Sequence, residues 1–240
     1  MKRLTTAGAV CALLFCCAVP VMAGTQTKTS VAETSVQATL SAARKGDAAA
    51  QLKLGEMYDL GEGVPQDYKE AAKWYRLSAE QGNPVARFAL AEMYKNGDGV
   101  PKDIQTAIKW YRLAADQDYA MAQLLLGVLY ESGTGVKASA GEAARWYRLA
   151  ANGGNAHAQL LLANLYNAGQ GVARDPVAAY ALYTVSAERE PRDNPAAGHR
   201  TDLARGMSAA EIERASLLAR EMTKPGKLLK ALDRHLKNPG

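Results

Sequence analysis

The stretch LGEMYDLGEGVPQDYKEAAKWYRLSAEQG, from Leu54 to Gly82, decides the fold because the chain repeats it. Written from Gly46, Gly82, Asp118 and Gly154, the sequence forms four gapless copies of 36 residues, namely 46–81, 82–117, 118–153 and 154–189. Self-similarity at one fixed period indicates a repeat architecture, in which neighbouring units stack and share a continuous core. We therefore expect one supersecondary unit per copy.

The first half of each copy predicts an amphipathic helix. An alanine, a leucine and a tyrosine recur at i, i+4 and i+8, a spacing that places them on one helix face. A small residue follows the leucine every time, and we expect a neighbouring helix to cross closely there. The apolar slots are Ala50, Leu54 and Tyr58, then Ala86, Leu90 and Tyr94, then Ala122, Leu126 and Tyr130, then Ala158, Leu162 and Tyr166; the small residues are Gly55, Ala91, Gly127 and Ala163.

The second half of each copy predicts another helix with its own start signal. Asp67-x-x-Glu70 and Ser139-x-x-Glu142 fit the capping box, and Asp175 places a cap before a proline at the first helical position. One hairpin cannot bury both of its helices, whereas stacked hairpins can. The apolar slots are Ala71, Trp74, Tyr75 and Leu77, then Ala107, Trp110, Tyr111 and Leu113, then Ala143, Trp146, Tyr147 and Leu149, then Ala179, Leu182, Tyr183 and Val185.

Between its two helices, each copy has a pair of glycines of the kind that phosphate-binding loops also contain. A nucleotide-binding loop follows a strand and opens a helix, whereas here a helix precedes the glycines and they recur in every copy. We therefore expect left-handed helix caps and tight turns, which glycine adopts without Cβ strain. The pairs are Gly61 and Gly63, Gly97 and Gly99, Gly133 and Gly135, and Gly169 and Gly171.

The combined motif resembles the Sel-one-like repeat (SLR) family, a relative of the tetratricopeptide repeat that has exported members. The residues of the first copy that carry the resemblance are Tyr58, Gly61, Gly63, Val64, Asp67, Ala71, Trp74, Tyr75 and Ala79. The third copy departs from the motif at Lys137 and Ser139, and the fourth at Leu182. The resemblance implies an all-α fold, a right-handed α-α superhelix (solenoid) of four 36-residue helix-turn-helix repeats with capping helices.

The segments outside the repeats predict a leader, a linker and caps. Residues 1–23 have a basic start, an apolar run and small residues before Gly24, which is the pattern of a cleaved signal peptide. Residues 24–34 are expected to be a flexible linker, 35–45 an N-terminal cap helix, and 190–222 a degenerate C-terminal capping helix pair. Residues 223–240 form a basic tail with a short helix at Leu228–Leu236, and we expect this tail to be solvated.

Removal of the leader changes both the cysteine count and the charge. All three cysteines lie in the leader, so the mature chain has no disulfide, thiolate nucleophile or cysteine metal site. Without Lys2 and Arg3, 27 of the 29 basic residues remain against 24 acidic ones, and five of these basic residues lie in 224–240 beside one acid. The repeat body is therefore close to neutral. We expect a periplasmic or secreted protein with no membrane span after cleavage and no nucleic-acid partner.

The remaining conspicuous residues indicate structure rather than catalysis. Trp74, Trp110 and Trp146 recur at one helix position, which favours packing between repeats over an exposed platform for a sugar or a base. The histidines do not pair at helical spacing as metal ligands would, and no serine lies in a nucleophile elbow. We therefore expect no enzyme activity, no catalytic residue, no cofactor and no metal.

The slots that vary between copies predict the binding surface. In tetratricopeptide-type solenoids the first helices line the concave surface, so the resemblance places in the groove a stripe at i, i+4, i+7 and i+11 of each first helix. We call this set the recognition stripe: Ala49, Lys53, Glu56, Leu60, Val85, Ala89, Glu92, Asn96, Met121, Leu125, Val128, Ser132, His157, Leu161, Asn164 and Ala168.

The recognition stripe begins polar and becomes apolar in the third and fourth copies. Apolar patches with a polar rim mark partner sites. The candidate partner-binding residues are Lys53, Glu56, Glu92, Met121, Leu125, Val128, His157, Leu161 and Asn164. The alternative is that the apolar members pack beneath the C-terminal helices.

These features favour an exported, monomeric repeat scaffold that binds a protein or peptide partner in its groove, as an adaptor, regulator or inhibitor. A second hypothesis is an envelope-assembly factor that engages cell-wall or polysaccharide machinery, also by binding. A third is a hydrolase, because some cysteine-rich SLR relatives resemble β-lactamases in reported activity. Those relatives carry a cysteine pair per repeat, and the mature chain has no cysteine, which argues against the third hypothesis.

Overall fold

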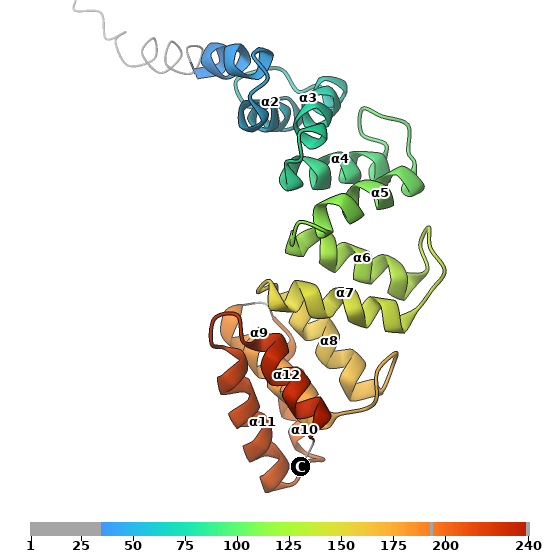
Figure 1. Ribbon diagram of the computed structural model, residues 1–240, viewed down its shortest axis with the longest axis vertical. Helices are drawn as coiled ribbons and strands as arrows, with labels where there is room; N and C mark the ends of the chain where they lie inside the picture. Colours follow the sequence, from blue (N-terminus) through green and yellow to red (C-terminus); the bar gives the residue numbers. More distant parts are fainter. Residues whose placement is uncertain (1–34, 193, 239–240) are drawn as a thin grey trace, which may run out of the picture.

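The computed structural model describes residues 35–192 and 194–238, and all regular secondary structure in these ranges is helical. Residues 35–44 are helical, and the later helices are α2 Ala48–Leu60, α3 Tyr68–Glu80, α4 Pro84–Asn96, α5 Ile104–Ala115, α6 Ala120–Ser132, α7 Ala140–Asn152, α8 Ala156–Ala168, α9 Pro176–Arg189, α10 Ala196–Ala204, α11 Ala209–Met222 and α12 Leu228–Lys237. The hairpins stack along the long axis of a curved molecule (Figure 1). The predicted all-α fold with stacked helix pairs is confirmed. The predicted signal peptide and linker lie outside the described residues.

Side-chain caps start the second helices where the sequence predicts them. Asp67 accepts a hydrogen bond from the backbone N–H of Glu70, and Ser139 accepts one from the N–H of Glu142. Each bond satisfies a backbone donor that has no partner inside the helix. The Glu70 carboxylate pairs with Lys73 and the Glu142 carboxylate with Arg145, and neither accepts from the N–H of its cap residue. Both caps are therefore one-sided, and the predicted capping boxes do not form.

The turn inside a hairpin requires both of its glycines, as Gly97 and Gly99 illustrate. Gly97 ends α4 in the left-handed region, with φ 92°, and its N–H donates to the carbonyl of Met93. Gly99 also has a positive φ, 67°, and a Cβ at this position would lie 2.1 Å from the carbonyl oxygen of Tyr68 in the preceding hairpin. The interpretation of these glycines as caps and turns is confirmed, and the second glycine also lets the turn contact the preceding repeat.

The core includes slots that the sequence predicts to be apolar, but the prediction is wrong for the leucine slot of the second helix, where Leu77 and Leu113 are exposed. The leucine slot of the first helix is buried in every repeat, and so is the tyrosine slot of the second helix: Leu54, Leu90, Leu126, Leu162, Tyr75, Tyr111, Tyr147 and Tyr183. Trp146 is buried, while Trp74 and Trp110 are half-buried and pack against the hydrophobic clusters of neighbouring helices. The predicted packing role of the tryptophans is confirmed.

Consecutive hairpins are also joined by a hydrogen bond from an arginine to a tyrosine. The arginine that follows the Trp-Tyr pair in a second helix donates to the tyrosine hydroxyl of the next first helix, and the three bonds are Arg76 to Tyr94 at 2.7 Å, Arg112 to Tyr130 at 2.9 Å and Arg148 to Tyr166 at 3.0 Å. The fourth copy has Thr184 in the arginine slot. There the regular stack ends, and α9 packs against α10 and α11.

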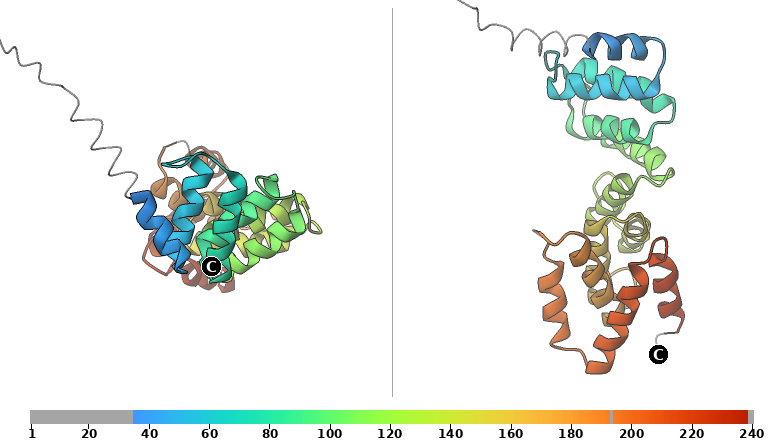
Figure 2. Two further views of the ribbon diagram at one scale, coloured as in Figure 1. Left: turned by 90° about the horizontal axis from the view of Figure 1, so that it is seen from above. Right: turned by 90° about the vertical axis from the view of Figure 1, so that its left-hand side faces the viewer.

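Helices close both ends of the stack, and at the C-terminal end the tail contributes one of them (Figure 2). At the N-terminal end, Ala43 is buried with Leu54 and Met57 of α2. At the other end, α12 packs against α7, α9 and α11, with Leu228, Ala231 and Leu232 buried. The expectation of a solvated tail is therefore wrong for residues 228–237. The three buried residues form one apolar helix face. The net charge of the tail favours a solvated segment and gives no sign of this face.

Two polar contacts fix α12 against residues far away in the sequence. Asp233 pairs with the guanidinium group of Arg148, and His235 Nε2 lies 2.9 Å from Asp175 Oδ2. Asp175 also caps α9, so the end of the chain is tied to the start of the last second helix. None of the described helices has the length and apolar character needed to cross a membrane.

Candidate partner-binding groove

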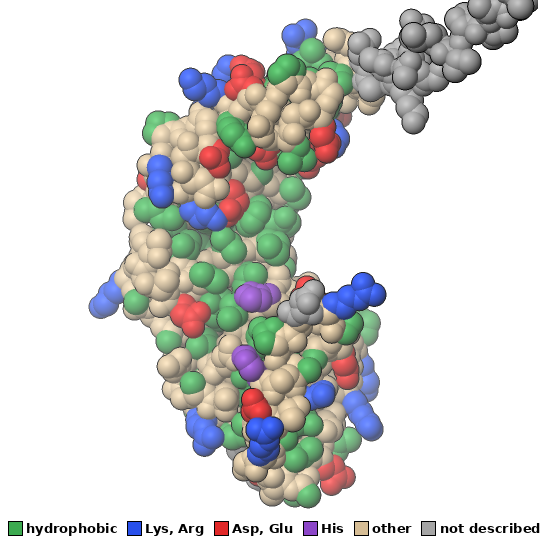
Figure 3. Space-filling model, turned by 180° about the vertical axis from the view of Figure 1, so that it is seen from behind, with side chains coloured by type: hydrophobic (Ala, Val, Ile, Leu, Met, Phe, Trp, Pro, Cys, Tyr) green, Lys and Arg blue, Asp and Glu red, His purple; other side chains and the backbone are tan. Residues whose placement is uncertain are grey.

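Exposed apolar side chains mark the recognition stripe. Among the described residues, nine large hydrophobic side chains are exposed, and four belong to the stripe: Leu60 at 64%, Val85 at 37%, Met121 at 42% and Val128 at 39%. Figure 3 shows the molecule from behind, with hydrophobic side chains gathered in its middle, toward the hollowed edge. Met121 and Val128 share α6, whereas Leu60 ends α2 and Val85 lies near the start of α4.

The structure brings the apolar members of the stripe together across α6 and α8. Leu125 and Leu161 are half-buried and pack against the same hydrophobic cluster. Met121 Sδ lies 3.3 Å from Nδ2 of Asn155, the N-cap residue of α8. Met121 and Val128 remain exposed, so the C-terminal helices do not cover them. His157, at the start of α8, is exposed as well.

The polar candidates are engaged inside their own repeats. Lys53 Nζ lies 3.3 Å from Glu56 Oε2, one turn away on α2. Glu92 pairs with Lys95 and also accepts a hydrogen bond from a buried tyrosine. Asn164 likewise accepts a tyrosine hydrogen bond, at 2.7 Å. Glu92 and Asn164 therefore occupy the predicted positions but have structural partners, whereas Met121, Val128 and His157 present exposed side chains.

Glu92 and Asn164 accept hydrogen bonds from buried tyrosines, a role that does not follow from comparing the four copies position by position. The buried tyrosine of each second helix donates to the first helix of its own repeat: Tyr75 to Asp59 at 3.2 Å, Tyr111 to Glu92, Tyr147 to Glu131 at 2.6 Å and Tyr183 to Asn164 at 2.7 Å. Burial, with a neighbouring carboxylate, raises the pKa of the first three hydroxyls far above its usual value. These hydroxyls therefore stay protonated and act as donors.

The small residue of the first helix correlates with the acceptor that the tyrosine uses. In the repeats with Gly55 and Gly127, the acceptor lies four residues after the glycine. In the repeats with Ala91 and Ala163, the acceptor is the next residue. A Cβ on Gly127 would lie 2.3 Å from Tyr147 Cε1, which confirms the close approach predicted at this slot.

At the C-terminal end of the stripe, α10 forms one wall of an open cleft of about 450 Å³. The cleft is lined by Asn164, Asn167, Tyr183, His199, Asp202, Leu203 and Gly206. The His199 ring meets Tyr183 edge-on, with ring centroids 5.5 Å apart. Repeat comparison had no means of finding this wall, because α10 lies outside the four copies. The cleft can supply amide, imidazole and carboxylate groups to a molecule seated on the stripe.

The fold is an α-solenoid of stacked helix hairpins, and its first helices carry exposed apolar side chains. The Sel1 repeat model matches residues 48–83, 84–119, 120–155 and 156–190. The chain therefore belongs to the Sel1 repeat family, and the family resemblance found in the sequence is confirmed. Each match starts two residues after the copy drawn from the sequence, at the first residue of the first helix.

Solved structures of other repeat proteins are similar to this chain. A Sel1 repeat protein from Oxalobacter formigenes is 36% identical with a TM-score of 0.67, and the match covers 71% of this chain and 49% of that one, so this chain spans about half of its length. A protective antigen from uropathogenic Escherichia coli, with an SLR fold, is 24% identical with a TM-score of 0.40, over 86% of this chain and 59% of that one. Helicobacter pylori cysteine rich protein B is 22% identical with a TM-score of 0.45, over 56% and 95%. A comparison with curated proteins found no match.

Proposed function

We propose that this chain is an exported repeat scaffold that binds a protein or peptide partner on its recognition stripe, as an adaptor, regulator or inhibitor. The single observation that carries the proposal is the exposure of Met121 and Val128, which lie one above the other on α6. Burial of such side chains by a partner contributes roughly 25 cal/mol per Å² of apolar surface removed from water. A folded monomer gains nothing from leaving them exposed.

Other residues along the recognition stripe support a polypeptide as the partner. Half-buried Leu125 and Leu161 extend the apolar surface, and the ion pair of Lys53 with Glu56 lies on the stripe of the first repeat. The amide groups of Asn164 and Asn167 line the cleft at the opposite end, where a peptide backbone needs donors and acceptors. Export rests on the leader pattern of residues 1–23, and binding without catalysis rests on the lack of a reactive constellation in the sequence.

A crosslinking capture from the native periplasmic or extracellular fraction tests this proposal. The informative variant is Met121→Glu/Val128→Glu, because both side chains are exposed and the change should leave the fold intact. We expect the variant to melt close to the wild-type temperature and to lose the partner that the wild type captures. Substitution of Leu125 or Leu161 is less informative, because these half-buried residues also pack against the core.

The matched control is Leu77→Glu/Leu113→Glu. Leu77 and Leu113 are 43% and 42% exposed, similar to Met121 and Val128, but they lie on the second helices, outside the stripe. The control should capture the same partner as the wild type. Identical capture by the wild type and both variants would rule out the recognition stripe as the binding surface.

A further inference from the structure

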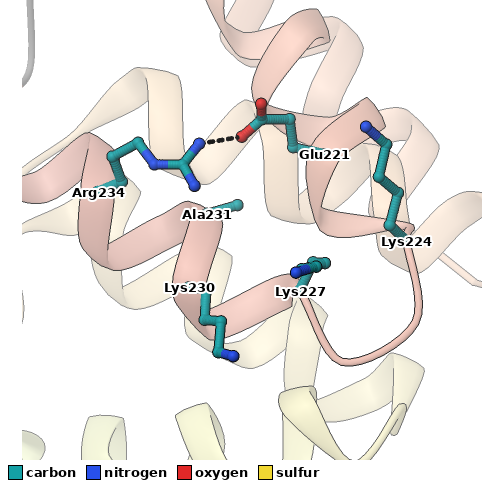
Figure 4. Close-up of a pocket in the computed structure, with 6 residues that line it drawn as sticks. All are labelled: Glu221, Lys224, Lys227, Lys230, Ala231 and Arg234. Carbon is teal, nitrogen blue, oxygen red and sulfur yellow. Dashed lines mark hydrogen bonds and ion pairs between the residues drawn. The ribbon is translucent and has the colours of Figure 1, made fainter.

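A second surface, separate from the recognition stripe, lies between α11 and α12. A pocket of about 170 Å³ at the connection of these helices is lined by Glu221, Lys224, Lys227, Lys230, Ala231 and Arg234 (Figure 4). It continues into an open cleft of about 580 Å³ along the same two helices, and the two cavities share Glu221, Lys224 and Arg234. We call the two cavities together the cationic cleft.

Positive charge in the cationic cleft exceeds negative charge. Glu221 is the one acidic residue among its described lining residues, and Arg234 Nη1 lies 2.9 Å from its carboxylate. Lys224, Lys227 and Lys230 are exposed and make no ion pair within the ranges that the structure describes. Three uncompensated cations around one cleft raise its positive potential, which attracts an anion.

Arg220 and the start of α12 add to this charge. Arg220 lines the continuation of the cleft along α11. Asp233, the one acid on α12, pairs with Arg148 of the repeat body and is not among the residues that line the cleft. The start of α12 has no side-chain cap, so its helix dipole contributes further partial positive charge beside Lys227.

One apolar residue distinguishes the kind of anion that fits. Leu217 lines the same cleft and is 54% exposed. A free phosphate ion makes no use of an exposed leucine, whereas a peptide supplies acidic and apolar side chains along one strand. The two connected cavities extend along both helices, which suits a linear segment better than a single ion.

We propose that the cationic cleft docks an acidic peptide segment of a partner protein, with carboxylates against Lys224, Lys227 and Lys230 and an apolar side chain against Leu217. Exposed charge pairs each contribute little, so the segment binds weakly by itself and in a salt-dependent manner. The site shares no residue with the recognition stripe. Evidence against this proposal would therefore leave the proposed function unaffected, and evidence against the proposed function would leave this proposal unaffected.

Fluorescence anisotropy of the full mature chain with a labelled peptide, in which glutamates flank one leucine, tests the proposal. We expect saturable binding that weakens as salt is added, and no binding of the same peptide with lysines in place of glutamates. Lys224→Gln/Lys227→Gln/Lys230→Gln should weaken binding by about tenfold, because it removes three charge pairs. Leu217→Ser should weaken it to a smaller extent.

The control removes the same amount of charge elsewhere. Lys69→Gln/Lys102→Gln/Lys137→Gln replaces three exposed lysines of the repeats and should bind the acidic peptide as the wild type does. Equal loss in both triple variants would show attraction by net charge alone and would overturn the proposal. It would also be overturned if phosphatidylglycerol vesicles bound in a manner that depends on the three cleft lysines while the peptide did not bind.

Discussion

At the residue scale, the small residue of the first helix, a glycine or an alanine, correlates with the acceptor that the second-helix tyrosine uses in the same hairpin. The two possible acceptor positions are filled differently in each repeat. The first repeat offers both Glu56 and Asp59, whereas the third offers only Glu131, because Val128 occupies the nearer position. The first repeat has a glycine in the small slot and uses the farther acceptor. The small residue, and not only acceptor supply, therefore directs the tyrosine.

The difference between these two repeats predicts that the same substitution destabilises one repeat more than the other. Gly127→Ala places a Cβ 2.3 Å from the Tyr147 ring, and a displaced hydroxyl finds no acceptor at Val128. Overpacking of this kind costs about 1–3 kcal/mol, and the gain in helix propensity offsets about 1 kcal/mol of it. Gly55→Ala should be milder, because Glu56 can accept the hydrogen bond from Tyr75. Urea unfolding should rank Gly127→Ala as the less stable variant.

Two further variants separate this explanation from a general effect of alanine. Gly198→Ala in α10 meets no atom within 4 Å, so it should be neutral or stabilising by up to about 1 kcal/mol. Adding Val128→Glu to Gly127→Ala recreates the arrangement of the second repeat, with Ala91 and Glu92, and should restore part of the lost stability. Equal losses in Gly55→Ala and Gly127→Ala would refute the role of the acceptor.

At the scale of elements, α12 shows how a charged segment can still form part of the core. Its lysines and arginine lie on one side, while Leu228, Ala231 and Leu232 lie on the other and are buried. The sequence contains this pattern, since the possible helix at Leu228–Leu236 is visible in it. Nothing in the pattern says what the apolar face would contact, because the contacts of α12 with α7 and α9 are single and long-range rather than repeated.

Leu232→Ala tests the docking of α12. Leu232 is fully buried, and shortening a buried leucine to alanine commonly costs about 2–5 kcal/mol. We expect a loss in that range, limited by the free energy with which α12 docks, and faster amide hydrogen exchange throughout α12. Leu236→Ala, at a side chain that is 37% exposed, is the control and should change little. Wild-type stability of Leu232→Ala would mean that α12 does not dock in solution.

At the scale of the whole molecule, the fourfold repetition of one sequence motif made the helices, turns and core positions predictable. Four copies report the same helices, turns and core slots, so variation among copies separates packing residues from free ones. The same comparison was misleading at Glu92 and Asn164, which vary between copies yet bind buried tyrosines. Comparison of the copies could not reveal the cleft beside His199, because α10, which forms one wall of that cleft, has no equivalent in the four repeats.

The central claim for the whole molecule is that a partner polypeptide covers the stripe on the first helices. Site-specific photocrosslinking in the native fraction tests this claim most directly, with a photoreactive amino acid at Val128 or, as the control, at Leu113. Both side chains are exposed, but only Val128 belongs to the recognition stripe. The account predicts a discrete adduct of higher mass from position 128 and none from position 113. No adduct at 128, or the same adduct from both positions, would contradict it.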